Sequence, residues 1–174
     1  MKWNVAILLC CSVALGQSPS KPALHLPVAL ASVLSEVKAN SNLEVLLPSE
    51  LPHPIGEAKY ATVVSDSPNK YGISLYYELD LGDSGFAASF SADAHPDYEP
   101  KDIPNVRKVK LSKGFIGYFR AVSCGGSCAP ANLWWEEGHV LYSLQLSLRS
   151  ELPNKDQRRK MIAVANSAIL AGPR

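Results

Sequence analysis

Strict alternation of apolar with polar or small residues along one stretch constrains the fold of this chain more than any other feature. Five apolar side chains occupy every second position from residue 71 onward: Tyr71, Ile73, Leu75, Tyr77 and Leu79. Successive side chains of a strand point to opposite faces of a sheet, so this spacing predicts a strand with one buried face. A second alternation over residues 86–90 follows the turn residues 82–85. Two alternating runs around a short turn predict a β-hairpin.

Other segments extend this pattern into a sheet flanked by two helices. Further strand-like runs, separated by turn residues, lie at residues 60–65, 106–111, 115–122, 132–136 and 140–148. Apolar residues three and four apart predict a helix over residues 26–39, with Pro27 at its first position. A similar stripe predicts a final helix, with Asn154 as its cap and Gln157 completing a capping box. This order predicts an α+β fold: an antiparallel sheet of about six to seven strands with the N-terminal and C-terminal helices packed on one face.

The first sixteen residues have the pattern of an export signal. Lys2 supplies a positive charge, and residues 5–14 are almost wholly apolar. Ala14 and Gly16 place small residues at the positions that a signal peptidase requires, so we expect cleavage to leave Gln17 as the first mature residue. The sequence therefore predicts a signal peptide at residues 1–16 and a single α+β domain at residues 17–174, located in the periplasm or secreted.

Two alternatives for this segment are a buried N-terminal helix and a lipid anchor. Cys10 is preceded by Leu9, where a lipoprotein signal has a small residue, and this disfavours the anchor. The apolar run is also shorter than the roughly twenty residues needed to cross a bilayer, and no later run is long enough. We therefore expect no stable membrane span after cleavage.

Without the signal, Cys124 and Cys128 are the only cysteines in the chain. Thiols that lie close together in an exported protein usually form a disulfide, and the intervening Gly125 and Gly126 let the backbone fold back. Closing so short a loop stabilises the fold by about 2 kcal/mol at best, so we expect the bond to shape a loop. A redox pair and a metal site with His139 as third ligand are the alternatives; the spacing disfavours the first and a missing fourth ligand the second.

Charge and motifs exclude several classes of function. The mature chain has 16 basic and 16 acidic residues, which lacks the basic excess of a nucleic-acid binder. The run Arg158-Arg159-Lys160 is interpreted as the wet face of the final helix. No nucleophile elbow or dinucleotide loop is present, and no cofactor, metal or catalytic residue is predicted. The loop at residues 93–99 contains His95 among three carboxylates and is expected to be solvated, with a hard cation as the alternative.

Aromatic side chains supply the candidate binding surface. Trp134 and Trp135 are adjacent in a predicted strand, so their rings must point to opposite faces. We expect one to lie in the core and the other on the outer face, either as an exposed binding anchor or as a half-buried packing residue. Tyr76 and Tyr118 also point away from the apolar side of their strands. The predicted surface is therefore Trp134 or Trp135, Tyr118, Tyr76 and the loop at residues 124–128.

Three short motifs, in their order, resemble a known family. They are Leu-Leu-Pro-Ser-Glu-Leu-Pro at residues 46–52, Leu-Trp-Trp-Glu-Glu-Gly-His-Val-Leu-Tyr at residues 133–142, and Ile-Ala-Val-Ala-Asn-Ser at residues 162–167. The chain resembles, over residues 43–170, a bacterial extracytoplasmic domain family of unknown function. Its members are found in secreted proteins and in the outer portions of anti-sigma-factor-like membrane proteins. The family implies no catalytic residues, and the loop at residues 124–128 is not part of its pattern.

Together these features predict an exported, non-enzymatic domain that binds a protein partner or a ligand. One alternative is an exported hydrolase or thiol-redox enzyme built around His95 or the cysteine pair. Another is a carrier for a small apolar molecule held between sheet and helices.

The signal assignment has a direct test. Protein recovered from its native host should begin at Gln17, because cleavage is expected after the small residue Gly16. N-terminal sequencing and intact mass measure this, and a chain that still begins at Met1 would contradict the predicted export.

Overall fold

The structure, a computed structural model, describes residues 25–80 and 85–174. The predicted signal at residues 1–16, its cleavage point and residues 82–84 of the predicted turn lie outside the described residues. Within the described part, no helix is long and apolar enough to cross a bilayer.

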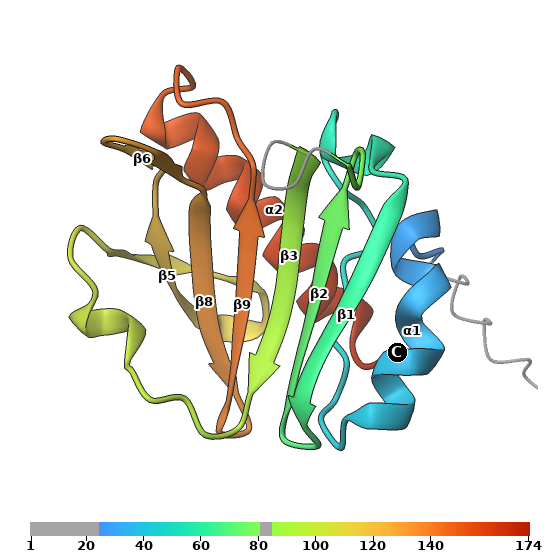
Figure 1. The fold of residues 1–174 in the computed structure, drawn as a ribbon. Helices are drawn as coiled ribbons and strands as arrows, with labels where there is room; N and C mark the ends of the chain where they lie inside the picture. Colours follow the sequence, from blue (N-terminus) through green and yellow to red (C-terminus); the bar gives the residue numbers. More distant parts are fainter. Residues whose placement is uncertain (1–24, 81–84) are drawn as a thin grey trace, which may run out of the picture.

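A seven-stranded antiparallel sheet lies at the centre, in the strand order β1-β2-β3-β9-β8-β5-β4 (Figure 1). Its strands are β1 (Tyr60–Ser67), β2 (Lys70–Tyr76), β3 (Phe86–Asp93), β4 (Arg107–Lys110), β5 (Ile116–Arg120), β8 (Ala131–Glu137) and β9 (Val140–Leu146). A separate two-stranded ribbon joins β6 (Ser123–Cys124) to β7 (Cys128–Ala129). The described residues also contain the short 3-10 turns η1 (Ile55–Glu57), η3 (Pro100–Asp102) and η4 (Ser112–Gly114).

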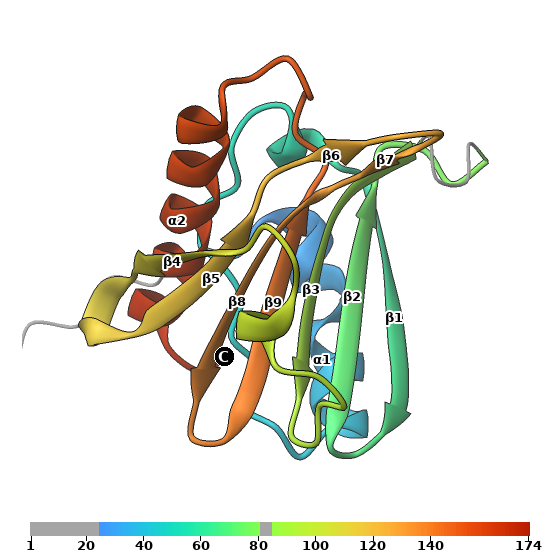
Figure 2. The same cartoon turned by 90° about the vertical axis from the view of Figure 1, so that its left-hand side faces the viewer.

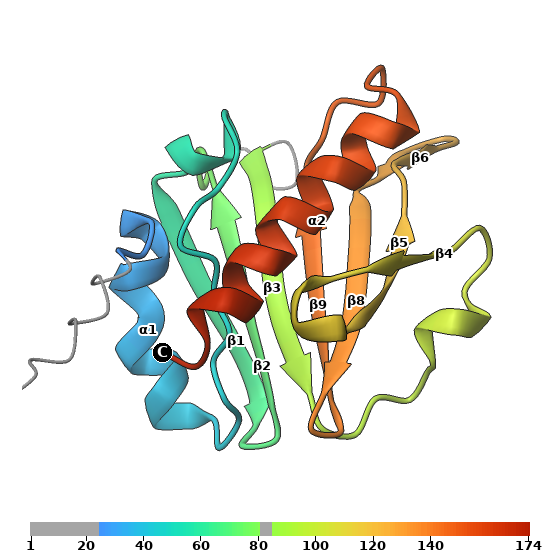
Figure 3. The same ribbon diagram turned by 180° about the vertical axis from the view of Figure 1, so that it is seen from behind.

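Two helices, α1 (Val28–Asn40) and α2 (Asn154–Ala171), pack against the same face of this sheet (Figure 3). The predicted α+β fold and the antiparallel pairing of its strands are therefore confirmed. The strand register explains why this face is buried, because it aligns apolar side chains across the strands. One such row is Ile73, Phe90, Leu144, Leu133 and Phe119. The stripe predicted for the final helix, from Met161 to Ile169, packs into the same core.

The segment that links α1 to the sheet runs between the two helices (Figure 3). Two buried phenols fix it there. The hydroxyl of Tyr71 accepts a hydrogen bond from the Leu46 N–H at 3.2 Å, and the hydroxyl of Tyr142 donates one to the Glu44 carbonyl at 3.1 Å. Burial raises the pKa of Tyr71, and burial with the nearby charges of Glu137 and Glu44 raises the pKa of Tyr142 to about 12. Both phenols therefore stay neutral and hydrogen-bonded at physiological pH.

Both helix starts differ from the sequence prediction. Pro27 is the residue before the first turn of α1, which begins at Val28. Asn154 is the first residue of α2 rather than its cap, because Pro153 occupies the cap position and makes no side-chain capping bond. Gln157 is consequently free of a capping role, and its side chain is buried inside the molecule. The strand predicted to continue to Leu79 ends at Tyr76, after an irregularity in its pairing with β3.

Replacement of Tyr71 by Phe tests the link between the α1 segment and the sheet. The free energy of unfolding should fall by about 1–3 kcal/mol, since the buried Leu46 N–H loses its acceptor. Tyr60→Phe is the matched control, because Tyr60 is 44% exposed on the edge strand β1, and its effect should stay within about 0.5 kcal/mol. Equal stabilities of the two variants in urea unfolding would show that the bond contributes nothing.

Candidate functional site

The ribbon β6–β7 projects from one end of the sheet and is exposed along residues 123–129 (Figure 2). Cys124 and Cys128 face each other in its register and form the predicted disulfide, with an S–S distance of 2.07 Å. The Gly125 N–H donates to the Ser127 carbonyl at 2.9 Å, which closes the tip. The disulfide and this hydrogen bond restrict the conformation of the tip, where a Cβ atom added at Gly125 or Gly126 would meet no other atom within 4 Å.

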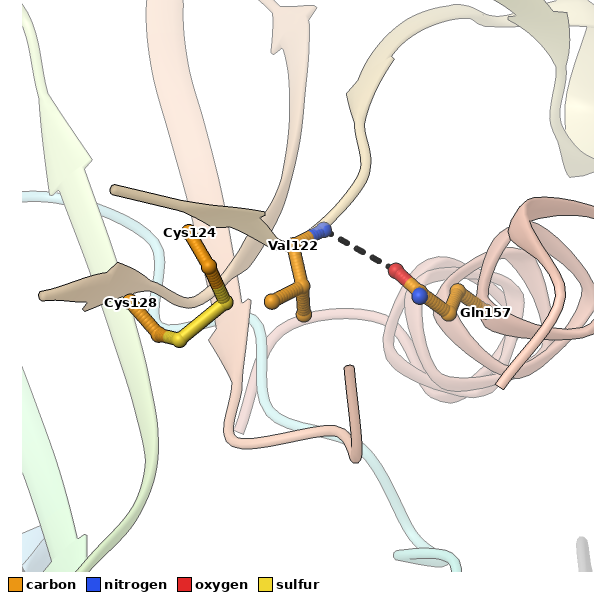
Figure 4. The surroundings of a disulfide bond; sticks show 4 residues. All are labelled: Val122, Cys124, Cys128 and Gln157. Atoms are coloured by element: carbon orange, nitrogen blue, oxygen red, sulfur yellow. Dashed lines mark hydrogen bonds between the residues drawn. A yellow bond between two sulfur atoms is a disulfide. The ribbon is translucent and has the colours of Figure 1, made fainter. Parts of the chain in front are cut away.

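Buried polar side chains hold both legs of the ribbon at its base. Gln157, only 1% exposed, accepts a hydrogen bond from the Val122 N–H at 2.9 Å and donates to the Leu152 carbonyl at 2.8 Å (Figure 4). Asn132, also 1% exposed, donates to the Pro130 carbonyl at 2.9 Å on the other leg. These two are the fully buried polar side chains of the described residues. Burying a polar group is unfavourable without a partner. Both the oxygen and the nitrogen of the Gln157 amide are bonded, whereas Asn132 is bonded through its nitrogen and its Oδ1 atom has no partner among the described residues.

Two pockets border this ribbon, and they share Val122 and Ala129 as wall residues. The first has a volume of about 540 Å³, and we call it the basic pocket. Its charged lining residues are all cationic: Arg107, Arg120, Lys155 and Arg158. The second has a volume of about 460 Å³, and we call it the aromatic pocket. Tyr76 and Phe86 line it, with ring centres 6.1 Å apart in an edge-to-face arrangement, beside the polar Gln145 and Ser147.

Trp134 and Trp135 are both buried. Of the two interpretations that the sequence left open, the exposed binding anchor is therefore wrong, and the packing role fits. Trp135 lies on the inner face, 3% exposed, and stacks on Tyr142 with ring centres 5.5 Å apart. Trp134 lies on the outer face, as the alternation requires, but is only 5% exposed. The guanidinium of Arg120 covers its ring at 5.6 Å from the centroid, and Tyr118 is its register partner on β5.

The four predicted aromatic residues do not form one patch either. Tyr76 ends β2, whereas Tyr118 lies on β5, and β3, β9 and β8 separate these strands. Tyr76 borders the ribbon through the aromatic pocket, so of this set it is the residue that the structure brings to the loop at residues 124–128. Side-chain direction was predictable from the alternation, but the covering of Trp134 depends on Arg120 from a neighbouring strand.

Two of the three carboxylates in the acidic loop at residues 93–99 contact nearby groups. Asp93 pairs with the Lys70 ammonium at 3.3 Å and accepts a hydrogen bond from the His95 N–H at 2.8 Å. Glu99 pairs with Lys101, and this pairing raises the pKa of that lysine. A pocket of about 570 Å³ borders this loop. In the described ranges, no three His, Cys, Asp or Glu side chains converge as metal ligands would.

The basic pocket was missed by reasoning from the sequence. Arg158 belongs to the run that predicted a wet helix face, and for Arg159 that interpretation fits, because its side chain is exposed and pairs with Asp156 at 3.0 Å. Arg158, one residue earlier, turns into the pocket instead. Arg107 and Arg120 carry no local signal, because β4 and β5 lie far from α2 in the sequence and only the fold brings the three elements to one pocket.

Comparison of the chain with protein-family models, with curated proteins and with solved structures finds no match. The family resemblance given above therefore stays a prediction, and the site is interpreted from its own geometry.

Replacement of Gln157 by Leu should destabilise the protein by about 1–3 kcal/mol, because the buried Val122 N–H and Leu152 carbonyl both lose their partner. Gln145→Leu is the matched control. Gln145 lies half-buried on the outer face and makes one long bond, from Ser89 at 3.4 Å, so its replacement should change stability by less than about 0.5 kcal/mol. Thermal and urea unfolding measure both variants, and a Gln157→Leu protein as stable as the control would contradict the anchoring role.

Proposed function

We propose that this chain is a non-enzymatic domain that works outside the cytosol and binds a ligand at the ribbon β6–β7. The predicted export signal and the disulfide support the compartment. The observation that carries the proposal is the arrangement at the ribbon: both buried amides hold its base, while the ribbon itself stands exposed beside two pockets.

The ribbon contributes little to the stability of the fold and is better suited to binding at the surface. A five-residue disulfide loop stabilises a fold by about 2 kcal/mol at best, and buried amides only offset the loss of water when they are fully bonded. The rest of the sheet has an extensive apolar core that does not involve the ribbon. Groups that fix an exposed loop without adding to the core favour a role in recognition.

The aromatic pocket is the part of the site that suits an apolar group. Its volume of about 460 Å³ lies within the range of small-molecule sites. Tyr76 and Phe86 offer ring surfaces, while Gln145 and Ser147 supply polar atoms that could orient a bound molecule. A ligand with an aromatic or aliphatic portion and a polar end fits this lining.

The predicted carrier, with an apolar molecule between sheet and helices, has weaker support. The space between the inner face and the helices is filled by side chains such as Leu30, Phe90 and Met161, all of which belong to one continuous core. An apolar ligand would more readily use the aromatic pocket, which is open at the surface.

Thiol exchange is the second candidate function, favoured by the exposure of both Cys124 and Cys128. In such an exchange a dithiol would reduce the bond to two thiols and itself be oxidised to a disulfide. Rapid, reversible reduction by a mild dithiol, with a reactive thiol formed, would favour this candidate over a binding domain.

A screen of small aromatic and aliphatic compounds by amide chemical-shift mapping tests the binding proposal. Hits should shift amides of residues 122–130 and 145–148, and Tyr76→Ala should weaken them about fivefold or more, as truncation of an aromatic anchor does. Tyr98→Ala is the matched control, since Tyr98 is 45% exposed and lines the pocket beside the acidic loop. Hits that map to residues 96–104, or that survive Tyr76→Ala unchanged, would contradict the proposal.

A further inference from the structure

We infer that the basic pocket is a binding site for a phosphate-type oxyanion. This inference rests on the proposed function, because it assigns a ligand chemistry to one of the two pockets beside the ribbon. The cationic lining of the pocket and the helix start described below point to the same chemistry.

Two different parts of the fold deliver the positive charge. Arg107 comes from the edge strand β4 and Arg120 from the end of β5, while Lys155 and Arg158 lie three residues apart on α2 and so share one face of that helix. No Asp or Glu is among the residues that line this pocket. Like charges brought together from separate elements repel one another, so an anion in the pocket stabilises the cations around it.

Arg120 is held in place but is not satisfied by the protein. Its guanidinium rests over the Trp134 ring, 5.6 Å from the centroid, which restricts its motion. Its Nε atom is buried and has no hydrogen-bond partner among the described residues. The Trp134 ring lies on the outer face of the sheet and α2 packs on the inner face, so Arg120 adds positive charge beside the pocket. Arg107 and Arg158, which also line it, each carry the rigid fork of N–H donors that matches two oxygens of a phosphate.

The start of α2 adds backbone N–H donors and the positive end of the helix dipole. Pro153 precedes this helix without a side-chain cap, and its carbonyl accepts from the Asp156 and Gln157 N–H groups. The N–H groups of the first turn have no acceptor within a helix, and the positive end of the helix dipole lies there. Asn154 and Lys155 of this turn line the pocket. Asp156, the acidic residue of the turn, is paired with Arg159 at 3.0 Å and is not part of the lining.

The pocket volume of about 540 Å³ accommodates more than a bare ion. Phosphate groups occur on soluble phosphate esters and on lipid headgroups, and the lining described here recognises the group common to both. The experiment therefore begins with pyrophosphate and then separates the two sources.

Pyrophosphate is titrated into the purified protein at constant ionic strength, with sodium chloride as the balancing salt, and amide shifts are recorded. We expect saturable shifts at residues 122–123 and 154–158. Arg158→Gln should weaken the affinity about tenfold, the effect of losing one charge-assisted hydrogen bond. Arg159→Gln is the matched control: it removes the same charge one residue along, outside the pocket, and should change the affinity by less than about twofold because exposed charges are screened by salt.

Equal weakening by the two variants would show general attraction to a basic helix and would overturn the site, as would the absence of saturable shifts. Lys155→Gln provides a second pocket variant at an exposed position, in case Arg158→Gln disturbs folding. Failure of pyrophosphate binding while apolar compounds still bind at the aromatic pocket would overturn this inference alone. Failure at both pockets would overturn the proposed function as well.

Co-sedimentation with phosphatidylglycerol vesicles, compared with phosphatidylcholine vesicles, then distinguishes the sources. Vesicle binding that Arg158→Gln reduces and Arg159→Gln does not would support the site and identify a lipid headgroup. Vesicle binding that both variants reduce equally would count against the site.

Discussion

The hydrogen bond between the Val122 N–H and the Gln157 side chain joins the two halves of the site. It ties the leg of an exposed ribbon to the first turns of α2, while the second buried amide, Asn132, holds the other leg. Through Gln157 the start of α2 keeps its place beside β5, so the cations of the helix and of the sheet edge border one pocket. The disulfide closes the tip of the ribbon but does not fix its base.

The inner face of the sheet stabilises the fold, whereas the outer face and the sheet end carry the polar groups available for recognition. The inner face carries continuous apolar rows under α1, α2 and the segment that the two buried phenols hold, and this burial is the main stabilising term. The outer face and the sheet end carry serines, amides and arginines, which add little to the core. Arg120 belongs to both roles, because its guanidinium covers Trp134 on the outer face and the residue is also part of the lining of the basic pocket.

Local patterns predicted the fold well because strand alternation and helical stripes depend on neighbouring residues alone. The α+β class, the paired strands around residues 82–85 and 112–114 and the disulfide followed from such patterns. The site was predicted less well because it depends on contacts between distant segments. Trp134 is covered by Arg120, which comes from the neighbouring strand. Gln157 was predicted to complete a capping box, but its side chain turns inward because Pro153 takes the cap position. The basic pocket needs β4, β5 and α2 together, which no local pattern reveals.

Hydrogen exchange at the Val122 amide tests the central claim that Gln157, rather than the disulfide, positions the ribbon. We predict that this amide exchanges far more slowly than that of Gly126 at the exposed tip, and that it stays protected after Cys124 and Cys128 are reduced. Fast exchange in the native protein, or loss of protection on reduction alone, would contradict it.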